Sequence, residues 1–283
     1  MKDFFIYIPT RGRIEKQFTW DSLSAELKEI ATLVCPEEEA EAHQKKGRKV
    51  FVRPINGLSA VRQWILENAK HRYIVMPDDD LKFYNRARED AWNLKECDDT
   101  AINILFRRLH YNLKETYVHG GVSPRQMNNR HYPVKEIENS KNNAVLAIDR
   151  KILLQEKVRY DYLPLMSDYS MTLQLFMLGY PNFIITDYAW NQGGATGAKG
   201  GCSNYRTPAL QGEVAEAMAA RYSDVVRVEI KEPKGSWGTG QEQGEWKKRK
   251  DVRIQWKKAY EIGINDYGRR IKLDEETMTR EAV

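Results

Sequence analysis

The sequence has little of what defines several large classes of proteins. Its 283 residues include five histidines and three cysteines, Cys35, Cys97 and Cys202. The odd number and wide spacing of the cysteines argue against a disulfide framework, and neither residue type has the spacing of a zinc site. No apolar run approaches the ~20 residues that a membrane span needs, and the first residues lack the long apolar core of a signal peptide. We therefore expect a cytoplasmic protein with no membrane partner.

Several familiar enzyme motifs are also missing. No G-x-G-x-x-G follows the first apolar run, so a dinucleotide-binding fold is not supported. The stretch "GGATGAKGG" lacks the G-K-[ST] ending of a phosphate-binding loop, and there is no G-x-S-x-G nucleophile motif. These absences leave the acidic and basic clusters as the places to look for chemistry.

Hydrophobic residues make up 41% of the chain and charged residues 30%, a composition typical of soluble globular proteins. Short apolar runs alternate with helical patterns in the first half, which predicts a mostly parallel sheet with helices on both faces. The expected strands and helices of this half are strands 4–9, 30–36, 49–54 and 72–77 and helices 21–30, 37–47 and 58–70. In the second half we expect helices 100–114, 167–178 and 207–222, strands 116–123, 144–150 and 181–190, and a polar surface loop or hairpin over 124–143.

Three consecutive aspartates follow the strand expected at 72–77. Like charges on adjacent residues repel, so Asp78, Asp79 and Asp80 are either an exposed acidic turn or a site for a cation. Alternate residues of an extended chain point to the same side, so Asp78 and Asp80 can converge on one ion while Asp79 points away or holds a supporting partner. A hard divalent cation favours such oxygens and usually keeps a substrate phosphate as a further ligand.

Arginines follow the first strand, and an acidic residue opens a later helix. Ligands of open α/β sheets bind beyond the carboxyl ends of the strands, so Arg11 and Arg13 are expected to share a crevice with the aspartates. The alternative is a solvated turn. Asp168 follows Ser167, the expected N-cap of its helix, and by itself could simply be a favourable charge at the helix start.

The excess positive charge is concentrated near the end of the chain. The net charge is +5, and residues 246–258, "WKKRKDVRIQWKK", hold seven Lys or Arg against one Asp. Two tryptophans are interleaved with these basic residues, which is compatible with a polyanionic partner. The competing interpretation is a solvated helix face or strand edge.

Four stretches follow one another in the order found in GT-A glycosyltransferases: "IYIPTRGR", "GLSAVRQWIL", "YIVMPDDDLKF" and "SDYSMTLQLFMLGY". More closely, residues 4–260 resemble the phage TET-associated glycosyltransferases, which attach sugars to hydroxymethylated pyrimidines in DNA. "GGCSNYRT" and "DVRIQWKKAY" fit that group too. The resemblance implies a GT-A, Rossmann-like α/β fold, a nucleotide-sugar donor, probable UDP linkage of that donor, and a location in the infected host cell if the gene is carried by a phage.

The resemblance also implies roles for individual residues. Residues matching the nucleotide-sugar pocket are Pro9, Thr10, Arg11, Arg13, Arg62, Asp78 and Asp79, with Arg62 beside the diphosphate or the sugar. Asp78 and Asp80 match the ligands of Mn²⁺ or Mg²⁺. Asp168 matches the acidic residue that deprotonates the acceptor hydroxyl in inverting members, although this helix starts Ser-Asp where many relatives have Glu-Asp. Asn191 and Gln192 stand where many GT-A enzymes have a metal-binding His, so no third protein ligand is assigned.

We expect residues 1–225 to form a glycosyltransferase domain, with a nucleotide-sugar half at 1–125 and an acceptor half at 126–225. A basic extension would follow at 226–283, with Lys247, Lys248, Arg249 and Lys250 contacting nucleic acid, and the glycine-rich loop 191–206 would cover donor or acceptor. Two rival functions remain open. One is a GT-A enzyme acting on a carbohydrate or protein, and the other is a nucleic-acid-binding protein whose acidic triplet is only structural. The sequence indicates no oligomeric state.

Overall fold

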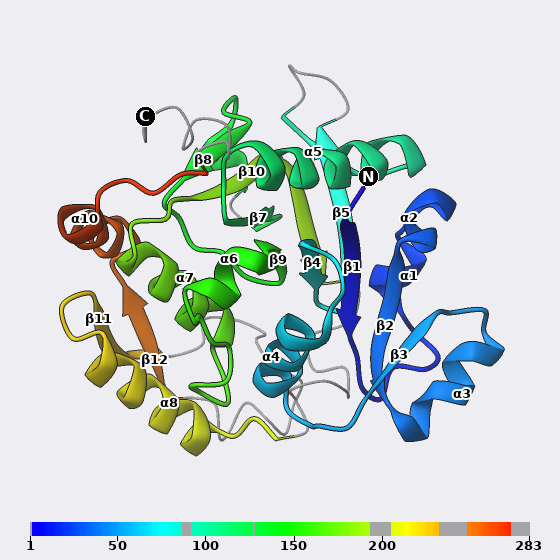
Figure 1. The fold of residues 1–283 in the computed structure, drawn as a ribbon, viewed down its shortest axis with the longest axis horizontal. Helices are drawn as coiled ribbons and strands as arrows, with labels where there is room; N and C mark the ends of the chain where they lie inside the picture. The colour runs from blue at the N-terminus through cyan, green and yellow to red at the C-terminus, as the bar shows by residue number, and fades with distance from the viewer. Residues whose placement is uncertain (1, 87–91, 127, 193–204, 232–247, 273–283) are drawn as a thin grey trace, which may run out of the picture.

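The fold is a mixed α/β structure, seen here in a computed structural model that describes residues 2–86, 92–126, 128–192, 205–231 and 248–272. Its first half is a parallel sheet in the order β3-β2-β1-β4. These strands are β1 (Phe4–Pro9), β2 (Ala31–Pro36), β3 (Val50–Arg53) and β4 (Tyr73–Pro77). Their carboxyl ends therefore lie at one edge of the molecule, the lower edge in Figure 1.

Helices cover both faces of this sheet (Figure 1). On one face, α2 (Ala25–Glu29) and α5 (Asp99–Glu115) pack with Phe4, Ile6 and Ile8 of β1. On the other face, α4 (Leu58–Asn68), α6 (Arg150–Gln155) and α7 (Ser167–Met177) pack with Tyr7. The alternation of side chains along β1 produces this division, because successive residues of a strand point to opposite faces. Two more helices complete the first half, α1 (Phe18–Asp21) and α3 (Glu37–Lys45).

Antiparallel strands extend the sheet beyond β4, in the order β9-β7-β10-β5-β6. These strands are β9 (Val145–Asp149), β7 (His119–Pro124), β10 (Asn182–Gln192), β5 (Leu81–Arg86) and β6 (Leu94–Glu96). β8 (Glu136–Glu138) also pairs with β10, and a short 3-10 helix, η1, spans Asn128–His131. β7 and β10 are parallel to each other, and β9 is antiparallel to both of its neighbours.

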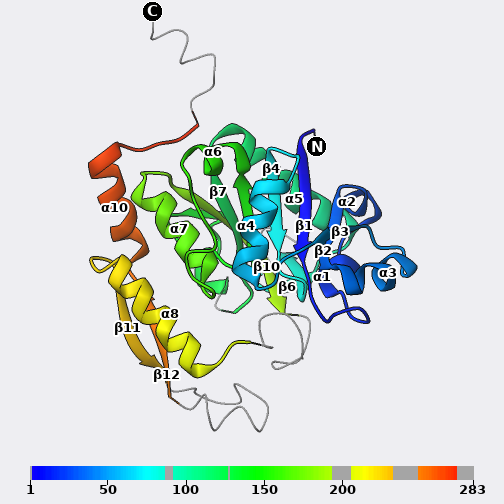
Figure 2. The ribbon, with the colours of Figure 1, turned by 60° about the horizontal axis from the view of Figure 1, so that its bottom comes forward.

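A further layer lies against α7, on the side away from the sheet (Figure 2). It consists of α8 (Pro208–Arg221), the antiparallel pair β11 (Val226–Lys231) and β12 (Arg249–Ile254), and α10 (Trp256–Tyr267). We call these four elements the C-terminal layer. Phe176 of α7 shares one hydrophobic cluster with Val226, Val252 and Tyr260. A Cβ on Gly263 would lie 1.9 Å from the carbonyl oxygen of Phe176, so a glycine there permits the close approach of α10 to α7.

The α/β fold, with a mostly parallel central sheet flanked by helices, is confirmed. β5, β6, β11 and β12 were not predicted, and the expected helix over 21–30 is divided between α1 and α2, with Ser24 capping the second. Ser167 was wrongly predicted as an N-cap, because α7 begins at Ser167 and Met166 precedes it with a φ of +59°. No described helix combines the length and the apolar character needed to cross a bilayer. The division at residues 225 and 226 stays a prediction.

Candidate active site

The three aspartates lie in a fixed turn between β4 and β5, at the edge where the parallel strands end. Thr19 secures the turn, because its hydroxyl donates to the carbonyl of Asp78 at 2.5 Å and accepts from the amide of Leu81 at 2.9 Å. On the other side, the amide of Asp78 donates to the carbonyl of Ala144 at 2.8 Å. Helix α1 and the residue before β9 therefore hold the backbone, and the positions of the carboxylates are set by the fold.

Asp79 points toward the end of β1. Its Oδ2 accepts from the hydroxyl of Thr10 at 2.6 Å, and its Oδ1 lies 3.0 Å from Nε of Arg13. Gln17 in turn donates to the Thr10 hydroxyl at 2.6 Å. Burial raises the pKa of Asp79 to about 7, although Arg13 and the Thr10 hydrogen bond favour the ionised form. These contacts make Asp79 the residue that ties the β4 turn to the β1 turn.

Asp80 and Asp78 are each held by a different arginine. Nη2 of Arg13 lies 3.2 Å from Oδ2 of Asp80, so Arg13 bridges Asp79 and Asp80. Nη2 of Arg62 donates to Oδ1 of Asp78 at 2.7 Å. Burial raises the pKa of Asp78 to about 6, and Asp80 raises it further while Arg62 opposes the shift. Burial likewise raises the pKa of Asp80. The turn thus concentrates negative charge that two arginines only partly compensate.

Arg62 connects the aspartate turn to the start of α7. It is only 2% exposed, and its Nη1 donates to the hydroxyl of Ser167 at 3.1 Å while Nη2 binds Asp78. Arg62 was predicted to lie beside the donor. Its buried guanidinium instead lies beneath the site, where it fixes Asp78 relative to α7. Direct contact between Arg62 and a nucleotide sugar stays a prediction.

Asp168 lies in the first turn of α7, as expected. Its Oδ1 accepts from the amide of Tyr169 at 3.0 Å. Its negative charge contributes to the raised pKa of Asp78 and opposes the desolvation that lowers the pKa of Lys141. Because electrostatic effects of this kind require proximity, Asp168, Asp78 and Lys141 belong to one neighbourhood. The structure thus brings together side chains that lie 90 residues apart in the chain.

The donor set fits a divalent cation that also binds a substrate phosphate. Within the described residues there is no group of three or more His, Cys, Asp or Glu side chains arranged to hold a metal. Asp78 and Asp80 offer two carboxylates, each with one oxygen bound to arginine. Mg²⁺ is commonly held by one or two carboxylates together with substrate phosphates and water. A cation there would also counter the repulsion that raises the pKa of Asp78. Gln192 stands where many GT-A enzymes have a metal-binding His. It pairs with Leu81, so this position lies beside the aspartate triplet.

A second polar cluster lies at the ends of β1, β2 and β3. The exposed Arg11 donates from Nη1 to Oδ1 of Asn56 at 2.8 Å, and Arg53 reaches the same oxygen at 3.1 Å. The amide of Gly12 donates to Oε1 of Glu39 at 2.8 Å. Sequence reasoning missed Arg53 and Asn56, although "VRP" at the end of a parallel strand was a signal that could have identified the arginine. The structure also leaves Pro9 and Thr10 buried beside this cluster.

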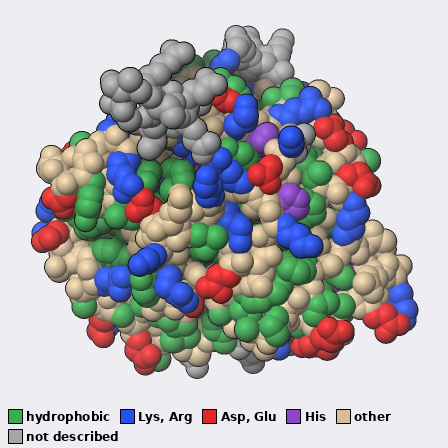
Figure 3. All heavy atoms as spheres, viewed as in Figure 1, with side chains coloured by type: hydrophobic (Ala, Val, Ile, Leu, Met, Phe, Trp, Pro, Cys, Tyr) green, Lys and Arg blue, Asp and Glu red, His purple; other side chains and the backbone are tan. Residues whose placement is uncertain are grey.

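The basic residues predicted to contact nucleic acid are only partly available. Lys247 lies outside the described residues, as does most of the loop predicted to cover the site, 193–204. Lys248 is exposed at the start of β12. Arg249 lies 3.6 Å from Asp251, and Lys250 forms an ion pair with Glu216 of α8. Figure 3 shows basic and acidic side chains intermixed over the face in view. Part of the positive charge of the run is therefore compensated within the protein.

Comparisons with known proteins complete the description of the site. A search of curated proteins finds no match. Among solved structures, the chain resembles S. aureus TarS 1–349 with 10% identity and a TM-score of 0.46, over 76% of this chain and 65% of that one. It thus spans just under two thirds of the TarS chain. It also resembles glucosyl-3-phosphoglycerate synthase from Mycobacterium tuberculosis, in complex with Mg²⁺ and UDP, with 11% identity and a TM-score of 0.48, over 80% and 83% of the two chains.

A match between the sequence and a family profile identifies the family of the chain. The profile of the TET-Associated Glycosyltransferase family matches residues 4–201, which include the β1 turn, the aspartate triplet and the start of α7. The GT-A class that the resemblance implied agrees with the α/β fold described above. The chain belongs to the TET-associated glycosyltransferase family.

Proposed function

We propose that the protein transfers a sugar from a nucleotide sugar, UDP-linked, to the hydroxyl of a 5-hydroxymethylpyrimidine in phage DNA, in the cytoplasm of the infected host cell. The observation that carries the proposal is the arrangement of Asp78 and Asp80 opposite Asp168, coupled through Arg62 and Ser167, in a member of this family. The cluster of Arg11, Arg53 and Asn56 beside it supports a nucleotide site at the ends of β1 to β3.

The site's own residues account for binding and proton transfer. Asp78 and Asp80 would hold Mn²⁺ or Mg²⁺, which would neutralise charge on the departing nucleotide diphosphate. Arg13 and Arg62 keep the two carboxylates in place from below. Asp168 would accept the proton of the hydroxymethyl group as its oxygen attacks the anomeric carbon, and the bond from that carbon to the diphosphate oxygen would break.

Transfer requires the acceptor hydroxyl to enter a glycosyl-transfer site that encloses it. An atom inside a duplex cannot enter such a site, so the modified base would leave the stack before transfer. We assign the nucleotide sugar to residues 1–125, the acceptor to residues 126–225, and DNA binding to the basic residues of 226–283. The exposed described residues of that basic run include Lys248, which precedes β12, and Lys257 in α10.

The test is incubation of the protein with hydroxymethylcytosine DNA and a panel of nucleotide sugars, followed by digestion and nucleoside mass spectrometry. The expected product is a glycosylated nucleoside that depends on Mn²⁺ or Mg²⁺ and disappears with Asp168→Asn. Unmodified DNA is the acceptor control. Hydrolysis of the donor without any modified nucleoside would instead favour the rival function, transfer to a carbohydrate or protein. A lack of any nucleotide-sugar affinity would favour the non-enzymatic nucleic-acid-binding protein.

A further inference from the structure

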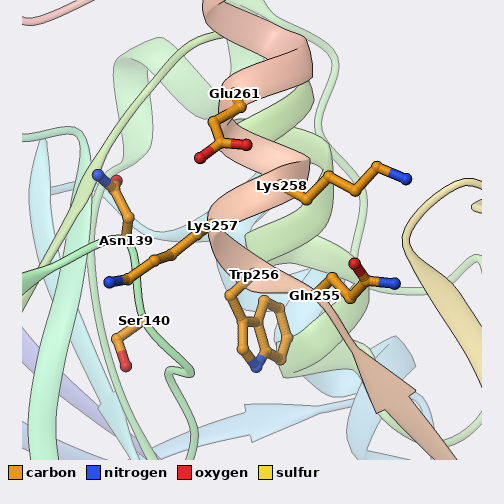
Figure 4. A pocket seen from close by; sticks show the side chains of 7 residues that line it. All are labelled: Asn139, Ser140, Gln255, Trp256, Lys257, Lys258 and Glu261. Carbon is orange, nitrogen blue, oxygen red and sulfur yellow. The ribbon is translucent and has the colours of Figure 1, made fainter.

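A pocket of about 450 Å³ opens between the loop that follows β8 and the start of α10 (Figure 4). Asn139 and Ser140 form one wall, and Trp256 and Lys257 lie opposite them. In Figure 4 the Lys257 side chain extends across the pocket toward Asn139 and Ser140, whereas Lys258 points away from them. The ammonium of Lys258 is engaged with the carbonyl of Asp224 at 2.9 Å. An ammonium and an indole ring thus line the pocket beside Asn139 and Ser140, together with the carboxylate of Glu261, one helical turn from Lys257.

The Lys257 charge differs from its basic neighbours in having no partner. Lys250 is paired with Glu216 and Arg249 with Asp251. Among the residues that the structure describes, Lys257 has no ion pair or hydrogen bond, and its side chain is exposed. An unpaired ammonium beside a hydroxyl can bind an anion without first breaking an interaction within the protein.

Tyr169 lies between the pocket and the candidate active site. The Trp256 ring lies 5.6 Å from the Tyr169 ring, measured between centroids, and Tyr169 follows Asp168 directly. On the opposite wall, Ser140 is followed by Lys141, whose ammonium lies 5.0 Å from the centroid of the same tyrosine ring. Tyr169 therefore separates the pocket from Asp168, with a second lysine beside it.

We propose that this pocket binds a backbone phosphate of the acceptor strand, close to the nucleotide whose hydroxymethyl group faces Asp168. The proposal rests on the DNA acceptor proposed above. Phosphate contacts fix the register and orientation of a nucleic acid on a protein, which an unstacked nucleotide requires in particular. The donor diphosphate is assigned to the strand ends near Arg13, so a phosphate in this pocket belongs to the acceptor. Lys257 supplies the charge, and Ser140 supplies a hydroxyl donor.

The test compares Lys257→Ala with Lys45→Ala, a matched removal of an exposed lysine on α3. The acceptors are an oligonucleotide with one hydroxymethylcytosine and the free hydroxymethylated nucleoside, which has no phosphate. We expect Lys257→Ala to raise the KM for the oligonucleotide about tenfold, the loss of one charge-assisted contact. The donor KM and the rate with the free nucleoside should stay at the wild-type values. Lys257→Arg should restore most of the affinity for the oligonucleotide.

A binding titration makes the result independent of turnover. Removing one phosphate contact should lower the magnitude of the log-affinity versus log-salt slope by about 0.7 to 0.9. An unchanged slope for Lys257→Ala, or an equal loss with the free nucleoside, would overturn the pocket assignment. If wild-type protein binds the oligonucleotide but transfers no sugar to it, the proposed function fails, while the salt slope still decides whether the pocket binds phosphate. Absence of DNA binding by the wild type would contradict both.

Discussion

The aspartate turn and the C-terminal layer use charge in opposite ways. In the turn, charged groups are buried and held by one another: Asp79 is 7% exposed and Arg62 2%. On the C-terminal layer, the basic side chains of Lys248 and Lys257 are exposed to solvent. A buried pair loses several kcal/mol when one partner is removed, because the remaining charge is left without compensation. An exposed charge is instead screened by salt.

This difference separates two tasks. The buried turn is rigid, so the groups that face a donor are positioned before it binds, which lowers the cost of organising the site. The exposed layer offers long-range attraction without fixed geometry, which suits the approach of a long polyanion. Variants of the turn should therefore change the rate of transfer, and variants of the layer should change the affinity for DNA and its dependence on salt.

The largest expected effect is the loss of a carboxylate that would bind the cation. Asp80→Asn should lower transfer by about 10³-fold, since a metal supplies several kcal/mol of charge stabilisation and each 1.4 kcal/mol is a factor of ten. Excess EDTA should abolish transfer by the wild type, with recovery on addition of Mn²⁺. The measurement is the initial rate at saturating donor.

Asp79→Asn is the matched control, because it makes the same change from carboxylate to amide one residue away. It should reduce transfer much less, yet lower the melting temperature more, since Asp79 links Thr10 and Arg13. Full activity in EDTA, or equal losses of rate in the two variants, would contradict a metal site at Asp78 and Asp80.

The next effect concerns the proton acceptor. Asp168→Asn should lower the chemical rate by ~10²–10⁴ while donor binding stays near the wild-type value. Single-turnover measurements separate chemistry from product release, and the donor Kd can be measured by calorimetry. Asp161→Asn, where Asp161 pairs with Arg159, serves as a surface control. Wild-type turnover by Asp168→Asn would leave Asp168 as a favourable charge at the start of α7.

Much of the parallel half could be predicted from the sequence, because its strands are continuous apolar runs ended by Pro. β1, β2 and β4 end at Pro9, Pro36 and Pro77. The strand after the aspartates was missed because β5 alternates: Leu81 and Phe83 are buried while the side chains between them are partly exposed. Such a stretch carries no long apolar run, and its pairing with β10 and β6 makes it a strand.

The candidate site could be predicted in its residues but not in its connections. Strand ends and charge identified Arg13 and the triplet, and the family resemblance identified Arg62. The bridge from Arg62 to both Asp78 and Ser167 could not be anticipated, because it depends on α4 and α7 packing on the same face of the sheet. A local pattern contains no information about such a contact between distant segments.

A smaller effect is expected where strand β7 packs against α7. His119 of β7 is fully buried against Phe176, at 5.6 Å between ring centroids, and burial lowers its pKa to about 3. The folded protein therefore keeps His119 neutral, while the unfolded chain binds a proton below its ordinary pKa of about 6.5. Stability should fall as the pH decreases from 6.5 toward 3, by up to about 1.4 kcal/mol per pH unit from this residue.

The measurement is the free energy of unfolding by denaturant at several pH values between 7.5 and 5. The free energy of unfolding of His119→Asn should depend on pH less steeply than that of the wild type over this range, whatever the stability of the variant at pH 7.5. His131→Asn in η1 is the control, because that ring is only partly buried and burial lowers its pKa less than it lowers the pKa of His119. Parallel curves for His119→Asn and the wild type would mean that His119 does not titrate differently in the two states.

The smallest effect per residue is expected for the basic residues of β12 and concerns the salt dependence of DNA binding. The ion pairs in the structure distinguish these residues from one another. Each phosphate neutralised by a lysine or arginine adds about 0.9 to the magnitude of the log-affinity versus log-salt slope. Lys250 is already paired with Glu216, so Lys250→Ala should lower the slope by less than Arg253→Ala does, at an exposed residue of the same strand. Glu216→Gln should do the reverse and increase both DNA affinity and slope, because it releases Lys250.

None of these changes should move the donor KM, since the aspartate turn lies on the far side of α7. Titrations of the three variants against one duplex, from low to moderate salt, measure these differences. Equal slopes in all three would assign the basic run to a solvated surface and leave Lys257 as the better candidate for phosphate contact.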